Sequence, residues 1–419
     1  MMSQRRLLMM SAHLRKADHI NVKTQLMSLP LHSHTIPRCL PSALLHTYHY
    51  HLPAKKEICM CETLHYTRIS RFHSSSIWRC ERSTDKHARK TIFSGIQPTG
   101  VLHLGNYFGA VQQWVELQEK GENVIFSVVD LHSITLPQDP KNLYLQILTM
   151  AASLIACGID PSRAIIFQQS RVSEHAQLNW LLSCSTTMAR LGHLPQYKEK
   201  SSVLKEIPLG LYIYPVLQAA DILLYKATHV PVGEDQLQHI QLAAHLARVF
   251  NKKFGYTFPL PCSMVYDDSI ARVKSLRQPT KKMSKSESDP KSTINLTDTP
   301  DDIREKFKKA VTDFTSAVYF DDENRPGVSN MMAIHKAVSG KSFDEIRAEC
   351  EGMTTAQYKL LLADVVIQHL APIRLALDHL LNDKAYLNQL LDEGANRARE
   401  IASATWEEVR QKVGLSESI

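Results

Sequence analysis

The amino-acid sequence predicts an α/β protein in which a Rossmann-like parallel sheet is followed by an α-helical C-terminal domain. The first observation is an alternation of strand-length apolar runs and helical stretches between residues 91 and 191, the pattern that places helices on both faces of a parallel sheet. The second is the loss of strand signals beyond Pro290, where apolar residues recur at helical spacing. A chain of 419 residues, 44% of them hydrophobic, is long enough for both domains.

The strand and helix signals follow one another in order. Val124-Ile-Phe-Ser-Val-Val129 is an apolar run typical of a strand buried on both faces. Asp139-Pro140 opens a helix that Gly158 ends. The expected strands are 91–94, 124–129 and 164–167, and the expected helices cover 105–119, the stretch from Pro140 to Gly158, and 173 towards 191.

The C-terminal part of the chain carries helix signals instead. Thr299 stands at an N-cap position and Pro300 at the first helical position, with Asp301 and Asp302 in the first turn. We therefore expect three regions: a basic tail over 1–90, a Rossmann-like domain over 91–295 and a helical domain over 296–419.

Residues 1–90 have the composition of a transit peptide. They hold 15 Lys and Arg against 5 Asp and Glu, whereas residues 91–419 hold 34 against 37. An Arg- and Ser-rich, acid-poor N-terminal segment is typical of import into mitochondria or chloroplasts, and we expect the mitochondrial matrix rather than a plastid. The alternative is a tail that is retained and binds RNA. Because the rest of the chain is nearly neutral, the overall pI of 8.8 does not indicate a nucleic-acid-binding domain.

The sequence also argues against a membrane protein and a metalloprotein. No apolar run approaches the roughly 20 residues that span a bilayer, so we expect no membrane insertion. Cys59 and Cys61, with His65, resemble half of a metal site, but no second pair at zinc-ligand spacing follows. We therefore expect no protein-bound zinc or other metal.

Two segments carry candidate phosphate-binding chemistry. The first, Phe93-Ser-Gly-Ile-Gln-Pro-Thr-Gly-Val-Leu-His-Leu-Gly-Asn106, joins the first strand to the first helix. Its glycines allow the backbone to approach a ligand closely, and the N-terminus of the following helix favours phosphate. The second, Lys282-Met-Ser-Lys-Ser286, places two lysines, two hydroxyls and exposed N–H donors around a polyphosphate.

Together these motifs resemble those of class I aminoacyl-tRNA synthetases. His103-Leu-Gly-Asn106 stands where that family carries its His-Ile-Gly-His motif, and Lys282–Ser286 matches the second motif in full. Asn106 in place of the second histidine is usual in the tryptophanyl branch of the family. The other segments that resemble this branch, in its bacterial and organellar form, are Tyr214–Tyr225, Val230–Gln236, Pro279–Ser286, Ala310–Asp313 and Arg325–Asn330.

The resemblance implies a two-step reaction. The carboxylate of L-tryptophan attacks the α-phosphate of ATP, which gives tryptophanyl-adenylate and pyrophosphate, and the tryptophanyl group then passes to the 3'-terminal adenosine of tRNA(Trp). It also implies Mg²⁺ bound with ATP, a homodimer, and a helical domain that reads the anticodon. The basic cluster of that domain is Arg304, Lys306, Lys308 and Lys309.

The resemblance further implies roles for individual residues. The residues expected to be catalytic are His103, Asn106, Lys282 and Lys285. The expected ATP contacts are Gln97, Pro98, Thr99, Gly105, Asn106, Gly233, Glu234, Asp235, Val273, Lys282, Met283, Ser284, Lys285 and Ser286. The expected tryptophan contacts are Asp221, Gln236, Tyr214, Phe93 and His132.

Asp221 is the expected selectivity residue. It lies in the apolar segment Val216–Tyr225, where a carboxylate is costly unless it is paired. The indole N–H of tryptophan is a donor that this carboxylate can accept, and a site built around such a bond rejects an analogue without the donor by about 10⁴-fold or more. The alternative is an aspartate paired inside the protein with a Lys or Tyr.

Three other functions fit parts of the pattern. Tyrosyl-tRNA synthetases share the fold and motifs, but Ala219-Ala-Asp221 and Val230–Gln236 favour tryptophan. A small-molecule nucleotidyltransferase carries a similar first turn, but neither the long helical C-terminal domain nor the full Lys-Met-Ser-Lys-Ser string. A synthetase-derived RNA-binding or splicing factor would have damaged motifs, and the motifs of this chain are intact.

Overall fold

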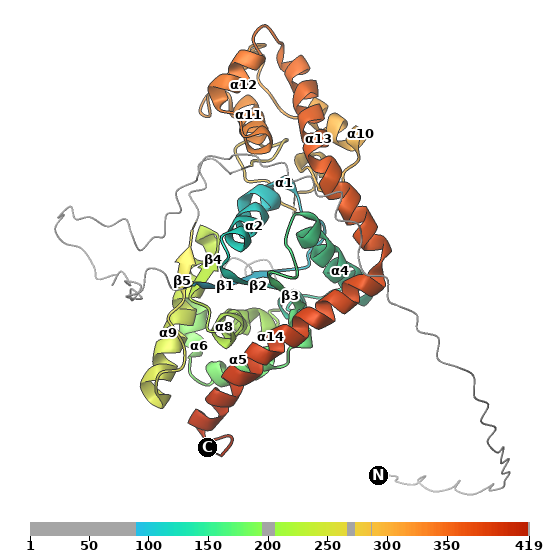
Figure 1. Cartoon of the computed structure of the whole chain (residues 1–419). Helices are drawn as coiled ribbons and strands as arrows, with labels where there is room; N and C mark the ends of the chain where they lie inside the picture. The colour runs from blue at the N-terminus through green and yellow to red at the C-terminus, as the bar shows by residue number, and fades with distance from the viewer. Residues whose placement is uncertain (1–88, 195–205, 266–272, 286, 418–419) are drawn as a thin grey trace, which may run out of the picture. The chain divides into compact units, whose positions relative to one another are not determined.

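Five parallel strands form a single sheet. The computed structural model describes residues 89–194, 206–265, 273–285 and 287–417; the predicted transit peptide up to residue 88 and Ser286 lie outside these ranges. The strand order is β3-β2-β1-β4-β5 (Figure 1). The strands are β1 (Thr91–Ile96), β2 (Asn123–Val128), β3 (Ile165–Gln168), β4 (His229–Pro231) and β5 (Cys262–Met264). The prediction of an α/β fold with a parallel sheet is confirmed.

Both faces of the sheet are covered by helices, so consecutive strand residues enter different cores. Ile92 and Phe126 pack with residues of α2 (Gln112–Glu119) and α4 (Pro140–Ala156). Phe93 and Ile125, their neighbours along the chain, belong to the opposite core. The helices that contribute to this second core include α5 (Glu174–Ser183), α8 (Leu209–Leu224) and α9 (Leu237–Phe254). Burial on both faces explains why the strands read as apolar runs without alternation.

Two of the expected helices are interrupted. The stretch 105–119 begins as α1 (Leu104–Asn106), passes through a π-helical turn at Tyr107–Val111 and continues as α2. The stretch from 173 towards 191 divides into α5 and α6 (Met188–Gly192), because the Thr187 hydroxyl accepts a hydrogen bond from Arg190 N (3.3 Å) and starts a new helix.

The described residues after Pro290 form helices and no strand, as the sequence predicts. The helices are α10 (Pro300–Lys309), α11 (Pro326–Ser339), α12 (Phe343–Glu349), α13 (Thr355–Asn382) and α14 (Lys384–Val413). The signal at the start of α10 is a true capping box: Thr299 Oγ1 accepts from Asp302 N (3.2 Å), and Asp302 Oδ2 accepts from Thr299 N (3.1 Å).

α13 is long and apolar enough, by length and composition alone, to cross a membrane. Its buried side chains, among them Tyr358, Leu362 and Val366, belong instead to the core that α10 and α11 share. In this structure the apolar face of α13 is therefore used for packing within the protein.

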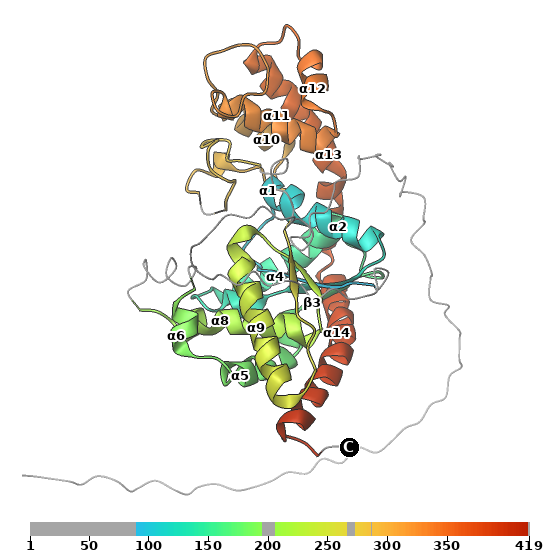
Figure 2. The same cartoon turned by 90° about the vertical axis from the view of Figure 1, so that its left-hand side faces the viewer.

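The last helix returns to the edge of the sheet. α14 lies along β3, an edge strand, in both views (Figures 1 and 2). Arg397 of α14 donates from Nη1 to the carbonyl oxygens of Pro161 (2.6 Å) and Ala164 (3.1 Å). At Gly394 the two backbones are so close that an added Cβ would collide with the carbonyl oxygen of Ile166. Glycine is required there for the helix to cover the strand edge.

We expect Gly394→Ala to destabilise the full chain by about 3 kcal/mol, because the new methyl group meets backbone atoms, which yield less readily than a side chain. Thermal unfolding followed by circular dichroism measures the change. The matched control is Gly109→Ala, since a Cβ at that helical position has no heavy atom within 4 Å and should change stability by less than about 1 kcal/mol. Equal melting temperatures for the two variants would refute this account of Gly394.

Candidate active site

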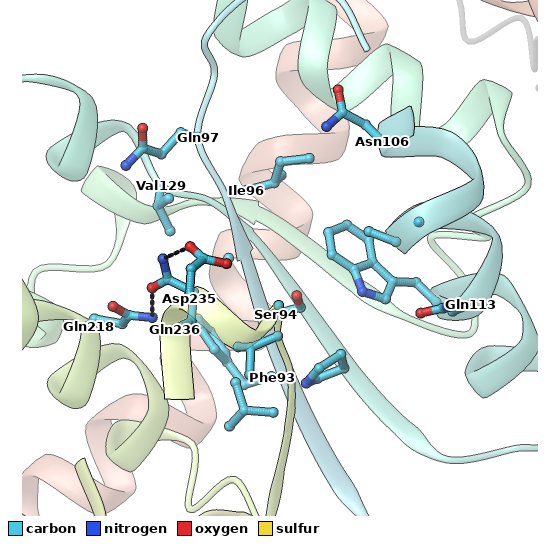
Figure 3. Close-up of a pocket in the computed structure, with 18 of the residues that line it drawn as sticks. Phe93, Ser94, Ile96, Gln97, Asn106, Gln113, Val129, Gln218, Asp235 and Gln236 are labelled. Carbon is cyan, nitrogen blue, oxygen red and sulfur yellow. Dashed lines mark hydrogen bonds between the residues drawn. The ribbon is translucent and has the colours of Figure 1, made fainter. Parts of the chain in front are cut away.

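A cavity of about 420 Å³ opens at the carboxyl ends of the strands. Its lining includes the residues that directly follow four strands: Gln97 after β1, Val129 after β2, Val232 one residue beyond β4 and Val265 after β5. Ligands of doubly wound sheets bind at this edge. Figure 3 shows polar side chains on two sides of the cavity, with Asn106 and Gln113 on one side and Gln218, Asp235 and Gln236 on the other.

The turn that holds His103 is closed by a reciprocal cap. His103 Nδ1 accepts from Asn106 N (3.2 Å), and Asn106 Oδ1 accepts from His103 N (3.3 Å). Burial, followed by the charges of Lys285 and Lys282, lowers the pKa of His103 to about 4. His103 is therefore neutral near pH 7. An added Cβ at Gly105 would lie 3.0 Å from the His103 ring, so glycine permits this tight turn.

The lysine motif lies against the first turn although 175 or more residues separate them. Met283 N donates to Val273 O (3.2 Å) and Ser275 N to Lys281 O (2.9 Å), so the motif is paired with the segment before it. Lys285 Nζ donates to the carbonyl oxygens of Thr99 (3.4 Å) and Gly100 (3.2 Å). Lys282 lines the cavity. The two predicted phosphate-binding segments therefore meet at one side of the cavity.

Asp221 lies in the wall of the cavity, 1% exposed, and three side chains donate hydrogen bonds to it. Its Oδ2 accepts from His132 Nε2 (2.8 Å), and its Oδ1 accepts from Gln169 Nε2 (2.7 Å) and His175 Nδ1 (2.6 Å). Burial raises the pKa of Asp221, but the bonds from His132 and His175 outweigh burial and hold the pKa below its ordinary range. The carboxylate is thus charged and paired inside the protein, with histidines and a glutamine rather than with the Lys or Tyr of the alternative prediction.

A second polar chain borders the same cavity. Gln236 Nε2 donates to Asp235 Oδ2 (2.7 Å), and Gln236 Oε1 accepts from Gln218 Nε2 (3.4 Å), as the dashed lines of Figure 3 show. His239 Nδ1 contacts Gln236 Oε1 (2.9 Å), and Tyr214 Oη lies 3.5 Å from His239 Nε2. Burial, then the Asp235 charge, raises the pKa of Tyr214 to about 12, so its hydroxyl stays protonated.

Comparison with known proteins gives a consistent result. The sequence model of the class I tRNA synthetases (W and Y) matches residues 85–371. The tryptophan–tRNA ligase of Wolinella succinogenes is 45% identical over 78% of this chain and 99% of its own length, and the mitochondrial tryptophan–tRNA ligase of Caenorhabditis elegans is 46% identical over 77% and 91%. The chain belongs to the tryptophan–tRNA ligase family.

Solved structures agree with this assignment. The tryptophanyl-tRNA synthetase of Campylobacter jejuni, in complex with ADP and tryptophan, superposes with a TM-score of 0.70 at 34% identity and covers 77% of this chain and 99% of its own. A tyrosyl-tRNA synthetase of Aeropyrum pernix, 19% identical with a TM-score of 0.54, shares the fold alone. The prediction of a class I tryptophanyl-type synthetase is confirmed.

The structure brings most of the predicted site residues together at one cavity. Those that line it are Phe93, Gln97, Gly105, Asn106, His132, Tyr214, Asp221, Gly233, Asp235, Gln236, Val273 and Lys282. The predicted residues that are described but absent from the lining are Pro98, Thr99, His103, Glu234, Met283, Ser284 and Lys285. Ser286 lies outside the described residues, and the contacts of all these residues with ligands stay predictions.

Sequence reasoning missed part of the lining. Gln113 and Trp114 of α2 and Gln218 of α8 face the cavity. Gln218 had a signal, because it is a polar residue three positions before Asp221 and so shares its helix face. Gln113 and Trp114 had no such signal. They follow a π-helical turn, which rotates the faces of the helix relative to those expected for a regular α-helix.

A residue of the C-terminal helical region also supports the lysine motif. Asn330 of α11, 3% exposed, accepts at Oδ1 from Lys274 N (2.8 Å) and donates from Nδ2 to Lys274 O (2.9 Å). Lys274 in turn pairs with Lys282 in an antiparallel bridge. The side-chain amide of Asn330 thus forms the two backbone hydrogen bonds that a neighbouring strand would otherwise form with Lys274. It thereby fixes the segment that pairs with the lysine motif.

We expect Asn330→Ala to leave both backbone groups of Lys274 without their buried partner, at a cost of about 2 kcal/mol, and to speed tryptic cleavage after Lys281 and Lys282. Limited proteolysis followed by mass spectrometry measures the rate at these bonds. Asn396→Ala, at an exposed position of α14, is the control and should cleave like the unmodified chain. Unchanged cleavage in Asn330→Ala would contradict this role.

Proposed function

We propose that this chain activates L-tryptophan with ATP and transfers it to tRNA(Trp) in mitochondria. The observation that carries the proposal is the position of Asp221: a buried, charged hydrogen-bond acceptor in the wall of a cavity whose other side holds both synthetase motifs. One end of the cavity then suits an amino acid with an N–H donor, and the other suits a polyphosphate.

At the amino-acid end, Asp221 accepts the indole N–H. A carboxylate has about four accepting positions, and three of those of Asp221 are used by His132, Gln169 and His175, so one is left at Oδ2. Phe93, stacked on Tyr225 with 5.4 Å between ring centroids, supplies an apolar wall together with His132. Tyr214 and Gln236 are the proposed contacts of the tryptophan amino group.

At the nucleotide end, no protein nucleophile is needed, because the substrate carboxylate attacks the α-phosphate and the protein supplies position and charge. Lys282 and Lys285 stabilise the charge that develops towards pyrophosphate, and neutral His103, next to Asn106, faces the phosphates. The proposed adenosine contacts run from Gly233 to Asp235, with Val273 at the adenine.

Mg²⁺ would enter with ATP and add positive charge at the phosphates. Among the described residues no group of three His, Cys, Asp or Glu side chains is placed to hold a metal ion. The ligands that we propose for Mg²⁺ are therefore the phosphate oxygens of ATP itself, with the two lysines sharing the neutralisation.

The helical region 296–419 is the proposed reader of the anticodon. Two members of its basic cluster are already paired: Arg304 with Asp364 (3.1 Å) and Lys306 with Asp298 (2.5 Å). Lys308 and Lys309 are exposed at the end of α10, and we propose that these two, rather than the whole cluster, face RNA.

The proposed compartment is the mitochondrial matrix. The composition of residues 1–90 supports it, as does the similarity to the mitochondrial C. elegans ligase.

We also propose a homodimer, formed through the first half of the catalytic region. Trp180 on α5 and Met188 on α6 are 74% and 73% exposed there, which is unusual for large apolar side chains. Sedimentation equilibrium should give twice the mass of one chain, and Trp180→Glu should shift it to one. A single-chain mass for the unmodified protein would contradict the dimer.

The activity is tested by amino-acid-dependent ATP–pyrophosphate exchange with the full chain. We expect exchange with tryptophan and none with tyrosine, and Asp221→Asn should lower kcat/KM for tryptophan at least 100-fold, because an amide carries N–H groups that clash with the donors around it. Asp392→Asn, at a side chain 68% exposed, is the matched control and should keep full activity. Exchange with tyrosine, or with neither amino acid, would overturn the proposal.

A further inference from the structure

A buried histidine that does not itself line the cavity is hydrogen-bonded through both ring nitrogens. His175, the second residue of α5, is 0% exposed. Its Nδ1 lies 2.6 Å from Asp221 Oδ1, and its Nε2 lies 2.8 Å from Tyr225 Oη. It is absent from the cavity lining, whereas Asp221 and His132 belong to it.

The partners of His175 determine which group donates in each of its two hydrogen bonds. The Asp221 carboxylate only accepts, so Nδ1 of His175 must carry the hydrogen between them. In the neutral imidazole, Nε2 is then bare and accepts from the Tyr225 hydroxyl, 2.8 Å away. Burial raises the pKa of Tyr225 well above its ordinary value, so that hydroxyl proton is retained. The Tyr225 hydroxyl thereby supports the tautomer of His175 that donates to Asp221, because it satisfies the bare Nε2.

The same contacts determine which oxygen of Asp221 is available to a ligand. Oδ1 receives hydrogen bonds from both Gln169 and His175, which uses its two accepting positions. Oδ2 receives one, from His132, and keeps a second. The rotation of the carboxylate is thus opposed by donors on both sides.

We propose that His175 is a positioning residue for amino-acid selectivity: with Tyr225 behind it, it holds Asp221 so that Oδ2 accepts the N–H of the bound side chain. This inference rests on the proposed function. It assigns to a residue remote from the substrate the orientation on which recognition of that N–H depends. Glu174, the residue before His175 in α5, accepts a hydrogen bond from Ser403 of α14 (2.6 Å). The C-terminal helix therefore helps to hold the start of α5, where His175 lies.

The test compares two substrates in the pyrophosphate exchange assay with the full chain. One is tryptophan, and the other is β-(3-benzothienyl)alanine, in which sulfur replaces the indole N–H at nearly the same shape. The ratio of their kcat/KM values reports the N–H bond alone, because a general loss of stability or of ATP binding lowers both rates equally.

We expect His175→Ala to lower this ratio at least tenfold, through KM for tryptophan more than through kcat. His175→Asn, whose amide nitrogen stands near the place of Nδ1, should restore the ratio to within threefold of the unmodified chain. Tyr225→Phe, which removes the donor to Nε2 of His175 but keeps the ring on Phe93, should lower the ratio at least threefold. If His175→Ala does not fold, Tyr225→Phe decides the question.

His335→Ala is the matched control, because His335 is also 0% exposed and lies 3.5 Å from a tyrosine hydroxyl, that of Tyr358, away from Asp221. It should cost stability and leave the ratio unchanged. An unchanged ratio in both His175→Ala and Tyr225→Phe would overturn the inference while leaving the proposed function intact. Absence of exchange in the unmodified chain would instead overturn the proposed function.

Discussion

The burial of the Asp221 carboxylate in an apolar helix is the interaction on which the proposed amino-acid end of the cavity depends. A charge at 1% exposure is tolerated only if hydrogen bonds replace the water that it loses. The donors come from three separate elements: His132 on α3 (Asp130–Ser133), Gln169 directly after β3, and His175 on α5. The positions of these elements relative to α8 are therefore constrained by one charge. The amino-acid selectivity that we propose for Asp221 is in this way tied to the stability of the fold around it.

The proposed nucleotide end depends on contacts between segments that are far apart in the sequence. The turn after β1 and the lysine motif meet through Lys285, and the motif is held from behind by Asn330 of α11. Burial keeps His103 neutral beside two lysines, so in our proposal the positive charge at the phosphates comes from Lys282 and Lys285, the second of which is held by the carbonyl oxygens of Thr99 and Gly100. The helical region thus contributes to the site through backbone positioning, in addition to any contact with RNA.

Much of this was accessible from the sequence, for identifiable reasons. Strands buried on both faces gave apolar runs at 124–129 and 164–167, and the capping box at Thr299 is a local signal. Asp221 was identifiable because a carboxylate in an apolar helix requires an explanation. Its partners were not, because His132, Gln169 and His175 are 89, 52 and 46 residues away and spacing carries no information about such contacts. The return of α14 to β3 was missed for the same reason: Gly394 is meaningful only once Ile166 is seen beside it.

Equilibrium binding tests directly whether Asp221 recognises an N–H donor, without the complication of later steps. Calorimetric titration of the full chain with tryptophan and with 1-methyltryptophan, in which a methyl group replaces the indole hydrogen, should show binding of the first and at least 100-fold weaker binding of the second. In Asp221→Asn the affinity for tryptophan should fall towards that of the methylated analogue. Equal affinities for tryptophan in the unmodified chain and Asp221→Asn would contradict the account.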